Sequence, residues 1–444
     1  MGRRRRRPRL PEGEFAAQIE SMSHDGRGVA RVDGKATFLW GGLPGEQVDF
    51  RYLNRRRQHD EGVVVSVSEP ADMRVKPRCE AFGLCGGCSL QHQHPDEQIA
   101  SKQKVLLDNL QQIGGVTPAA ILPPLRGASP WGYRRKARLG VKDVLRKGRV
   151  LVGFRERGSS LVADITRCEV LHPRVGEKID ALRILVESLS VRQNLPQIEM
   201  AMDDSQCVLI LRVLEPLSAQ DEQILVDFAS QHDVVFYTQS GGPETVRPLQ
   251  DAVQLAYRLP DFDLELAFEP SDFTQVNTEI NRLMVGRAID LLDLAPSDRV
   301  LDLFCGIGNF TLPIARTAGK VVGVEGDAAL VARARANARH NALDHVDYFT
   351  ADLYGELTSE SWMQQRFNKA LLDPPRSGAL QMLPALPRLG IERIVYVSCY
   401  PGTLARDAGE LVNTHGYQLR KAGVMDMFPH TAHVESIALF ERDS

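Results

Sequence analysis

The sequence predicts a multidomain protein with an N-terminal all-β barrel, a central α+β domain and a C-terminal α/β domain on a parallel sheet. Three observations lead to this prediction. Short strands broken by turn signals fill residues 14–68. Three cysteines then lie within ten residues of one another, from 79 to 88. Beyond residue 265, strands alternate with helices, a pattern typical of parallel sheets with crossover connections.

The length of 444 residues is enough for two or three domains that each bury a core. We expect a basic tail at 1–13, the barrel at 14–70, the central domain at 71–265 and the α/β domain at 266–444. No run approaches the roughly 18 apolar residues of a membrane span. No apolar signal segment stands near the start either, so we expect a cytoplasmic protein without membrane contact.

The net charge of −3 hides two strongly basic segments. Residues 1–60 carry 13 Lys or Arg against 8 Asp or Glu, and residues 126–158 carry 11 against 2. Two such segments on a near-neutral chain predict a polyanionic partner that touches only certain faces. The alternative for each segment is an ordinary solvated surface. The arginine-rich start, Arg3–Arg7, would add non-specific attraction to phosphate.

The N-terminal region reads as five or so short strands. Val29–Val32 and Lys35–Trp40 flank Asp33-Gly34, which is a typical two-residue hairpin turn. Further strands are expected at Val48–Leu53 and Gly62–Val67. So many strands in so few residues indicate a small barrel of the oligonucleotide-binding type, although any small all-β module has a similar pattern.

The central segment mixes helices and strands. Helical periodicity covers Asp96–Ile113 and stops at Gly114-Gly115, a helix-ending pair. Basic strands follow over 126–170. The remaining expectations are helices at Val175–Leu189 and Ala219–His232, a hairpin around Asp203-Asp204 and a strand at Val234–Thr238.

Four successive strand ends in the C-terminal domain carry residues suited to a nucleotide-like ligand. The strand Arg299–Phe304 leads into Cys305-Gly-Ile-Gly-Asn309, whose glycines let a ligand approach the backbone. The next strand ends in Glu325, which can accept hydrogen bonds from both ribose hydroxyls. Asp352 follows the third strand, near the expected adenine end, and Asp373 follows the fourth.

A dinucleotide site is the competing interpretation, but Thr311 stands where the NAD pattern needs its third glycine. The order of glycine loop, acid, acid and Asp-Pro-Pro instead resembles the Rossmann-like fold of S-adenosylmethionine-dependent methyltransferases. Enzymes that methylate exocyclic amines also use Asp-Pro-Pro, followed by an aromatic residue. Here Arg376 follows the prolines and a cysteine follows the next strand, a combination that favours methylation of a pyrimidine carbon.

Cys399 lies where the apolar strand 394–397 runs into a turn. Carbon 5 of a pyrimidine is too weak a nucleophile to attack a methylsulfonium unaided. A thiolate that adds to carbon 6 turns the ring into an enolate, and carbon 5 can then take the methyl group. We therefore predict Cys399 as the nucleophile, against the alternative of a small buried thiol. Cys207 and Cys305 are better explained by packing.

A general base must then remove the carbon 5 proton so that the thiol can leave. Glu435 opens the last strand, and a carboxylate in front of an apolar strand is partly desolvated, which suits it to act as a base. The alternatives are His430 or His433 as the base, or a plain surface role for Glu435.

Cys79, Cys85 and Cys88 supply three thiolates from one glycine-containing loop, and Cys168 is the natural fourth ligand. The odd total of seven cysteines also argues against a disulfide framework. Four thiolates suit a tetrahedral zinc ion and equally a four-iron cluster, and spacing alone does not separate the two. A radical iron–sulfur enzyme would instead place a triad such as Cys-x3-Cys-x2-Cys near the cofactor.

Over essentially its whole length, the chain resembles the RNA uracil-carbon-5 methyltransferases, most closely those that modify large-subunit (23S) ribosomal RNA. The matching motifs are Phe273-Thr-Gln-Val-Asn277, Asp302–Phe310, Asp373-Pro-Pro-Arg376, Ser398-Cys-Tyr-Pro401 and His433-Val-Glu435. The resemblance implies Cys399 as the nucleophile and Glu435 as the base. It also implies that six residues contact S-adenosylmethionine or the target base: Gln275, Phe304, Asn309, Glu325, Asp352 and Asp373.

The same resemblance implies a [4Fe-4S] cluster on Cys79, Cys85, Cys88 and Cys168, which favours iron over zinc. It also implies that the barrel is a TRAM domain, an RNA-binding relative of the oligonucleotide-binding fold. The transfer-RNA member of the family lacks both features, and a second ribosomal member has the cluster without the barrel. Residues 14–68 therefore distinguish the paralogues.

The expected partner is 23S ribosomal RNA, in a folded loop with a flipped or unstacked uridine, and the expected state is a monomer. One alternative is methylation of carbon 5 in a transfer-RNA uridine or at the second 23S site. Another is a cytosine-carbon-5 methyltransferase, although such enzymes place the thiol in a different loop. A non-catalytic RNA-binding assembly factor would leave Cys399 and Glu435 unexplained.

Overall fold

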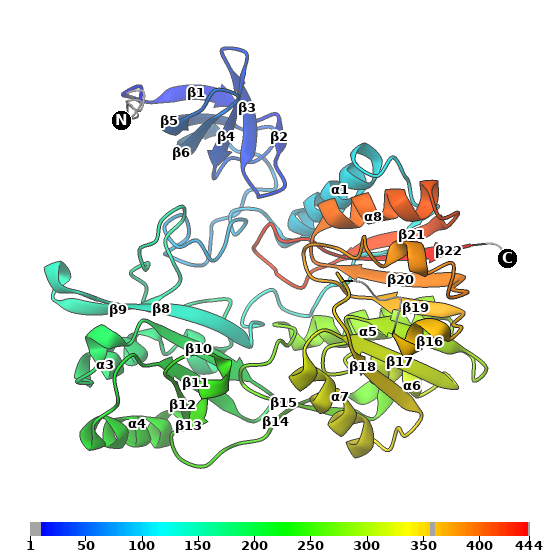
Figure 1. The fold of residues 1–444 in the computed structure, drawn as a ribbon. Coiled ribbons are helices and arrows are strands. Elements are labelled where there is room, and N and C mark those ends of the chain that lie inside the picture. The colour runs from blue at the N-terminus through cyan, green and yellow to red at the C-terminus, as the bar shows by residue number, and fades with distance from the viewer. Residues whose placement is uncertain (1–9, 356–359, 443–444) are drawn as a thin grey trace, which may run out of the picture. The chain divides into compact units, whose positions relative to one another are not determined.

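The computed structural model describes residues 10–355 and 360–442 (Figure 1). The predicted Arg3–Arg7 stretch lies outside these residues. The chain divides into two compact units. The first holds the residues up to 102 together with 155–163 and 429–433, and the second holds 103–154, 164–428 and the chain from 434 onwards. Boundaries at 70 and 265 remain predictions. Among the described residues, no helix is both long and apolar enough to span a membrane.

The first unit contains a small β-barrel. Its strands are β1 (Phe15–Gln18), β2 (Ser21–Met22), β3 (Gly28–Val32), β4 (Lys35–Trp40), β5 (Gln47–Arg55) and β6 (Asp60–Glu69). Only two residues separate β1 from β2, yet β1 pairs with β5 and β2 pairs with β3, at opposite ends of the sheet order. One stretch of chain therefore joins both edges and closes the sheet. The predicted all-β N-terminal region is confirmed.

Alternation along these strands fills the barrel, because successive side chains point to opposite faces. Ala30, Leu39, Val48 and Phe50 are all almost fully buried. The central pairing of β4 with β6 is parallel, whereas the other pairings in this sheet are antiparallel.

The cysteine loop follows the barrel in the same unit and leads to α1 (Pro95–Gln112). Arg74, which precedes the loop, donates a hydrogen bond of 2.7 Å to the fully buried Glu46 of the barrel. Segment 155–163 pairs with the loop through a bridge between Cys85 and Glu156. Two backbone hydrogen bonds of 2.8 Å flank this bridge, so the segment is fixed to the loop that carries the cysteines.

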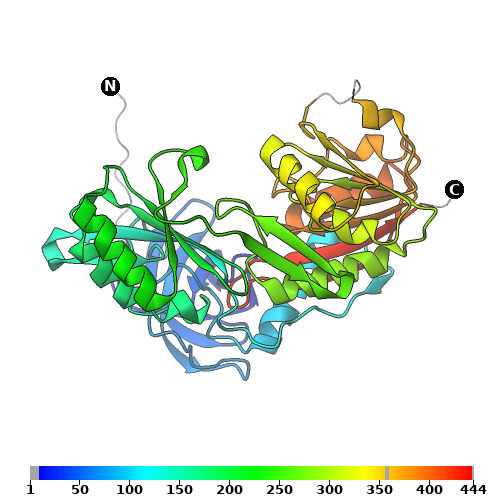
Figure 2. The same cartoon turned by 90° about the horizontal axis from the view of Figure 1, so that it is seen from below.

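The second unit begins with a six-stranded sheet in the order β13-β12-β11-β10-β8-β9. These strands are β8 (Lys136–Val144), β9 (Arg149–Gly153), β10 (Gln197–Met202), β11 (Cys207–Arg212), β12 (Val235–Gln239) and β13 (Arg247–Pro248). Helices α3 (Ile179–Ser188) and α4 (Ala219–His232) pack against each other and against β9 and β12, respectively (Figure 2). The predicted hairpin around 203–204 is confirmed as β10 and β11.

One predicted helix is wrong in its extent. The single helix expected over Val175–Leu189 is divided into α2 (Pro173–Gly176) and α3. The Gly176 carbonyl accepts a hydrogen bond from the backbone N–H of Cys168 at 2.8 Å, and the Asp180 N–H donates to Thr166 at 3.2 Å. In a continuous helix, the Asp180 N–H would instead donate to the Gly176 carbonyl. The chain around Cys168 takes both groups as partners and so interrupts the helix.

The C-terminal part of the second unit is an eight-stranded sheet in the order β18-β17-β16-β19-β20-β22-β21-β7. The five parallel strands are β16 (Arg299–Leu303), β17 (Lys320–Glu325), β18 (Val346–Thr350), β19 (Lys369–Leu372) and β20 (Arg393–Ser398). The others are β21 (Gln418–Met425), β22 (Glu435–Glu441) and the short β7 (Ala120–Ile121). Strand β22 runs antiparallel between β20 and β21. The predicted parallel α/β sheet is confirmed.

Helices cover this sheet (Figure 1). Helix α5 (Thr278–Leu292) packs on β19 and β20, α7 (Ala328–His340) packs on β17 and β18, and α8 (Pro401–Asn413) packs on β21. Between β16 and β17 the chain forms only the short α6 (Thr311–Ala315). A separate hairpin of β14 (Leu255–Leu259) and β15 (Leu264–Phe268) precedes α5.

Candidate active site

The predicted cofactor residues follow the ends of neighbouring parallel strands. Phe304 follows β16, Glu325 ends β17, Asp352 follows β18 and Asp373 follows β19. Because the carboxyl ends of parallel strands meet at one edge of a sheet, the fold brings these residues to the same edge. This edge is the usual ligand site of open α/β sheets.

The glycine loop after β16 needs an unusual backbone. Gly308 has a φ of +100°, a conformation that side chains rarely permit. Phe304 also has a positive φ, 65°, which is strained for a residue with a bulky side chain. The side-chain amide of Asn337, buried on α7, donates to the Ile307 carbonyl at 3.1 Å. The Asn337 side chain on α7 therefore helps to hold the glycine loop in this conformation.

Asn309 is fixed by two partners that the sequence did not suggest. Its amide and that of Asn281 exchange two hydrogen bonds of 3.0 Å, and the Tyr257 hydroxyl donates to its oxygen at 2.9 Å. Asn281 lies on the first turns of α5 and Tyr257 lies on β14. A polar residue on the buried face of α5 was the only sequence signal for this contact.

The carboxylates that were expected to hold the nucleoside already organise the backbone around them. Glu325 accepts hydrogen bonds from Gly306 N at 3.1 Å, from Gly326 N at 2.7 Å and from Asp327 N at 3.1 Å. Asp352 is exposed and accepts from Tyr354 N at 3.0 Å. Glu325 thus connects the glycine loop to the end of β17.

Two further carboxyl groups at this edge are strongly perturbed. Burial raises the pKa of Asp302 to about 8, against a 2.5 Å hydrogen bond from the Thr311 hydroxyl that favours the ionised form. Asp302 is fully buried and its other carboxyl oxygen has no hydrogen-bond partner. Burial also raises the pKa of Asp373 to about 7. Perturbed carboxyl groups of this kind concentrate at functional sites.

Cys399 and Glu435 meet through the antiparallel pairing of β20 and β22. The last paired residues are Ser398 and Ser436, and the Ser436 hydroxyl donates to the Ser398 carbonyl at 3.2 Å. Cys399 is the first residue after the end of β20, and Glu435, just before Ser436, is the first residue of β22. Cys399 is partly exposed, whereas Glu435 is only 3% exposed. The predicted nucleophile and base are therefore cross-strand neighbours.

The surroundings of Cys399 disfavour its thiolate. Burial, followed by the charges of Glu435 and Asp373, raises the pKa of the Cys399 thiol to about 11, and Arg376 opposes this shift. Reactive cysteines usually have a lowered pKa. The other thiols of the second unit that were assigned to packing, Cys207 and Cys305, are buried as predicted.

The Phe273–Asn277 motif connects β15 to α5. Gln275 is half-buried, and the Asn277 side chain caps α5 by accepting from Ile280 N at 3.3 Å. The segment before β8 binds this motif, since Arg135 N donates to the Val276 carbonyl at 2.9 Å. Part of the basic segment 126–158 therefore supports the loop that carries Gln275.

Two of the three cysteines in the first unit, Cys85 and Cys88, interact electrostatically with Arg157. Burial raises the pKa of the Cys85 thiol, an effect to which Cys79 adds and which Arg157 opposes. Gly87 N donates to the Cys85 sulfur at 3.4 Å. Over residues 10–355 and 360–442, no three His, Cys, Asp or Glu side chains are grouped as ligands of a metal ion. Cys168 belongs to the second unit.

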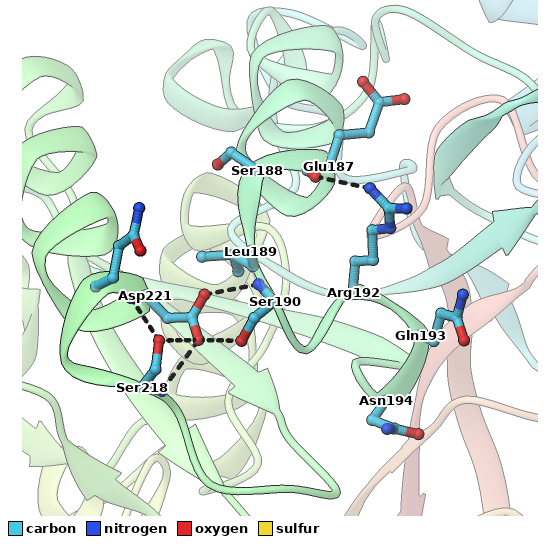
Figure 3. A pocket seen from close by; sticks show the side chains of 10 residues that line it. Glu187, Ser188, Leu189, Ser190, Arg192, Gln193, Asn194, Ser218 and Asp221 are labelled. Carbon is cyan, nitrogen blue, oxygen red and sulfur yellow. Dashed lines mark hydrogen bonds between the residues drawn. The ribbon is translucent and has the colours of Figure 1, made fainter.

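A polar cavity of about 560 Å³ lies beside the central sheet, lined by residues of 187–194 and 218–221 (Figure 3). One of its two carboxylates, that of Asp221, accepts hydrogen bonds from the backbone and hydroxyl of Ser190 and from those of Ser218. The Ser218 bonds cap α4 and the Ser190 bonds tie it to the chain before it, so the carboxylate has a structural role. None of the predicted site residues lines this cavity.

Comparisons with known proteins identify the family of this chain. The family described as tRNA (Uracil-5-)-methyltransferase matches residues 207–443. A Xanthomonas campestris pv. campestris protein named 23S rRNA (uracil(1939)-C(5))-methyltransferase RlmD is 53% identical over 442 residues, covering 99% of both chains. The protein of the same name from Alkalilimnicola ehrlichii is 54% identical over 446 residues, covering 100% of both.

A solved structure supports the fold. The tRNA (uracil-54, C5)-methyltransferase of Pyrococcus abyssi, in complex with S-adenosyl-L-homocysteine, matches with a TM-score of 0.73. The match covers 96% of this chain and 100% of that one, at 21% sequence identity. With the family match over more than half of the chain and relatives above 50% identity throughout, this chain belongs to the RNA uracil-C5 methyltransferase family.

Proposed function

We propose that this protein methylates carbon 5 of a uridine in 23S ribosomal RNA, with S-adenosylmethionine as the methyl donor. The observation that carries the proposal is the cross-strand placement of Cys399 and Glu435, at the sheet edge that also bears the glycine loop. The full-length relatives named for this activity support the choice of substrate.

In the proposed reaction, the Cys399 sulfur adds to carbon 6 of the uracil ring, and the electron pair moves toward carbon 5. Carbon 5 then takes the methyl group from S-adenosylmethionine; the methyl–sulfur bond breaks, and S-adenosylhomocysteine leaves. Glu435 then removes the carbon 5 proton, the double bond re-forms and the thiolate leaves. A base placed beside the departing sulfur suits this last step, because both groups act on adjacent carbons of one ring.

The raised pKa of the Cys399 thiol has a consequence for this scheme. In the free protein, burial and then the nearby carboxylates raise the pKa of this thiol, so that an even smaller fraction is ionised at neutral pH than for an ordinary cysteine. S-adenosylmethionine brings a positive charge to this edge, where Asp373 and Glu325 stand, and so offsets the negative charges that oppose the thiolate. The thiol therefore becomes more reactive only when the methyl donor is bound, which limits side reactions of the free thiol.

RNA binding is assigned to the barrel and to the basic segment 126–158. The closed barrel with its central parallel pair has the strand order of an oligonucleotide-binding fold, in support of a TRAM domain. Because Cys399 is at a sheet edge, the target base has to be flipped or already unstacked to present its ring. A monomeric state remains a prediction.

We also propose that the cysteine loop holds a [4Fe-4S] cluster, which would serve to order this loop. The donor set is entirely cysteine, as such clusters require, and the Arg157 guanidinium suits the negative charge of a thiolate-bound cluster. Cys79, Cys85 and Cys88 would supply three ligands. Two points remain predictions from the family resemblance: that Cys168 is the fourth ligand, and that the site holds iron rather than zinc.

The decisive experiment measures tritium release from carbon 5 of uridine-labelled 23S ribosomal RNA in the presence of S-adenosylmethionine. We expect release by the wild type and by Cys207→Ala, a matched change of a buried thiol, and none by Cys399→Ala. Release by Cys399→Ala, or none by the wild type, would contradict the proposal. Faster tritium release from labelled transfer RNA than from 23S ribosomal RNA would instead indicate a transfer-RNA uridine as the substrate.

The cluster is tested separately by iron and zinc analysis after anaerobic purification. We expect four irons per chain and their loss in Cys85→Ser. Stoichiometric zinc in place of iron would overturn the cluster. Normal folding and unchanged RNA affinity in Cys79→Ser would overturn its role in ordering the loop.

A further inference from the structure

The loop after β19 carries Asp373 and Arg376, and it ends in a tight turn. Gly378 N donates to the Pro375 carbonyl at 2.9 Å, so Arg376 and Ser377 are the central residues of a four-residue turn. Gly378 has a φ of +80°. A Cβ at this position would approach Arg406 Nη2 at 2.5 Å and Asp407 Oδ2 at 2.6 Å, so only glycine fits.

A buried carboxylate on α8 holds the end of this turn. Asp407 is fully buried, and its Oδ2 accepts from Ala379 N at 2.7 Å and from the Tyr396 hydroxyl at 2.6 Å. Its Oδ1 accepts from Arg406 Nε at 2.8 Å. Arg406 in turn donates to the Ser377 carbonyl at 2.8 Å. The carboxylate therefore binds the turn both directly and through the neighbouring guanidinium.

A second anchor acts on the same turn from the loop after β18. The Tyr354 hydroxyl donates to the Gly378 carbonyl at 3.0 Å and lies 2.7 Å from the Ser377 hydroxyl. Asp373, by contrast, is fixed independently, because its backbone N–H donates to the Leu303 carbonyl of β16 at 3.3 Å. A shift of the turn would therefore move Arg376 while Asp373 stays in place.

The elements that hold the turn also carry the nucleophile. Tyr396 is on β20, three residues before Cys399, and α8 begins two residues after it. Among the charged groups with the largest effect on the Cys399 thiol, Arg376 favours the thiolate, whereas Glu435 of β22 and Asp373 oppose it. The position of one side chain thus decides the balance of charge at the thiol.

We propose that Asp407 is a positioning residue for methyl transfer, which fixes the 375–378 turn so that Arg376 stands beside Cys399. Asp407 itself touches no reacting atom and acts only through this turn. The inference rests on the proposed function, because it matters to the reaction only if Cys399 is the nucleophile. A purely structural Asp407 is the competing interpretation, since a buried, fully bonded carboxylate also stabilises α8 and β20.

The test is the pH profile of Cys399 alkylation by iodoacetamide, without RNA or methyl donor. Trypsin cleavage after Arg393 and Arg406 releases residues 394–406, a peptide in which Cys399 is the only cysteine, so mass spectrometry reads this thiol alone. We compare the wild type with Arg376→Gln, Asp407→Asn and Gly378→Ala. Glu410→Gln, on the same helix, is the matched control.

We expect Arg376→Gln to slow alkylation about threefold to tenfold at pH 8 and to displace the profile to higher pH, because thiolate loses its nearby cation. Asp407→Asn and Gly378→Ala should give the same displacement, and neither should add to it in the Arg376→Gln background. The control should match the wild type.

Two results would overturn the inference: an unchanged profile in folded Asp407→Asn and Gly378→Ala, or effects that add to those of Arg376→Gln. Gly378→Ala keeps the test valid if Asp407→Asn does not fold. Failure of the proposed function shows elsewhere, as tritium release by Cys399→Ala, and leaves the alkylation profiles interpretable.

Discussion

Replacing Glu435 with glutamine separates two effects that the site gives to this carboxylate. Glu435 is the proposed base, and its charge also opposes ionisation of Cys399. Glutamine keeps the size of the side chain and removes both the charge and the basicity. The substitution should therefore make the thiol more reactive while it makes the enzyme less active, and few other changes in the chain would have opposite effects on these two quantities.

The size of the first effect follows from the strand register. Residues next to the Ser398–Ser436 pair stand about one cross-strand spacing apart, roughly 5 Å. Two unit charges at this distance interact by about 3 kcal/mol at an effective dielectric of about 20. Cys399 is partly exposed, so we discount this to about 1.4 kcal/mol, a tenfold change. With a pKa of about 11, about one thiol in a thousand is ionised at pH 8, and glutamine should raise this to about one in a hundred.

The assay uses the 394–406 peptide to follow alkylation of Cys399, together with tritium release and denaturing gels of protein mixed with labelled RNA. We expect alkylation at pH 8 to become about tenfold faster and turnover to fall about 10²- to 10⁴-fold, the usual contribution of a general base. Methylated RNA should remain covalently attached because the elimination step is blocked.

The matched control is Glu441→Gln, at the far end of the same strand, where the carboxylate pairs with Arg393 and Arg420. This control should leave both readouts unchanged. Turnover near the wild-type rate in Glu435→Gln, or slower alkylation of Cys399, would refute the reasoning and would return His430 and His433 to consideration as the base.

Three further predictions concern groups around the site and the cysteine loop. Asp302 keeps its proton in the folded state up to about pH 8, whereas the unfolded chain releases it near 3.8, so its contribution to stability is lost as pH rises through this window. Asp302→Asn should therefore gain free energy of unfolding relative to the wild type between pH 5 and 8 in urea titrations, and a constant difference would contradict this. Asn281→Ala leaves the Asn309 amide without its reciprocal partner, and calorimetry should show about five- to tenfold weaker binding of S-adenosylhomocysteine; equal binding would show that the pair is irrelevant to the loop. Arg157→Ala should lower iron content after anaerobic purification, while Arg138→Ala, a change at an exposed arginine of β8, should not.

The sequence was sufficient to predict the sheet, the glycine loop and the order of the strand ends, because each depends on local patterns. The strand predicted at 299–304 is β16, with its end within a residue. The strands predicted to end in Glu325 and just before Asp373 are β17 and β19. Helices were less certain where tertiary contacts interrupt them. The break between α2 and α3 depends on the Cys168 loop, which no helical periodicity reveals.

The support around the site could not be predicted, because it joins residues far apart in the chain. Tyr257 and Asn281 hold Asn309 from a hairpin and a helix that precede the glycine loop. Asp407 binds a turn 28 residues earlier in the chain. In each case a single polar residue lies on a buried face, and its type shows that it needs a partner without showing which one.

The meeting of Cys399 with Glu435 depends on one reversal of direction in the sheet. Had β22 been parallel to β20, its first residue would lie at the amino edge, opposite the ligand-binding edge where Cys399 stands. The antiparallel insertion of β22 instead places its start next to the end of β20. Glu435, the first residue of β22, thereby lies next to Cys399, which follows the end of β20, although 35 residues separate the two in the chain. The same pairing buries Glu435 and leaves Cys399 partly exposed. The proposed general base is thus shielded from water, and the sulfur stays accessible, as the proposed addition to an extruded uridine requires.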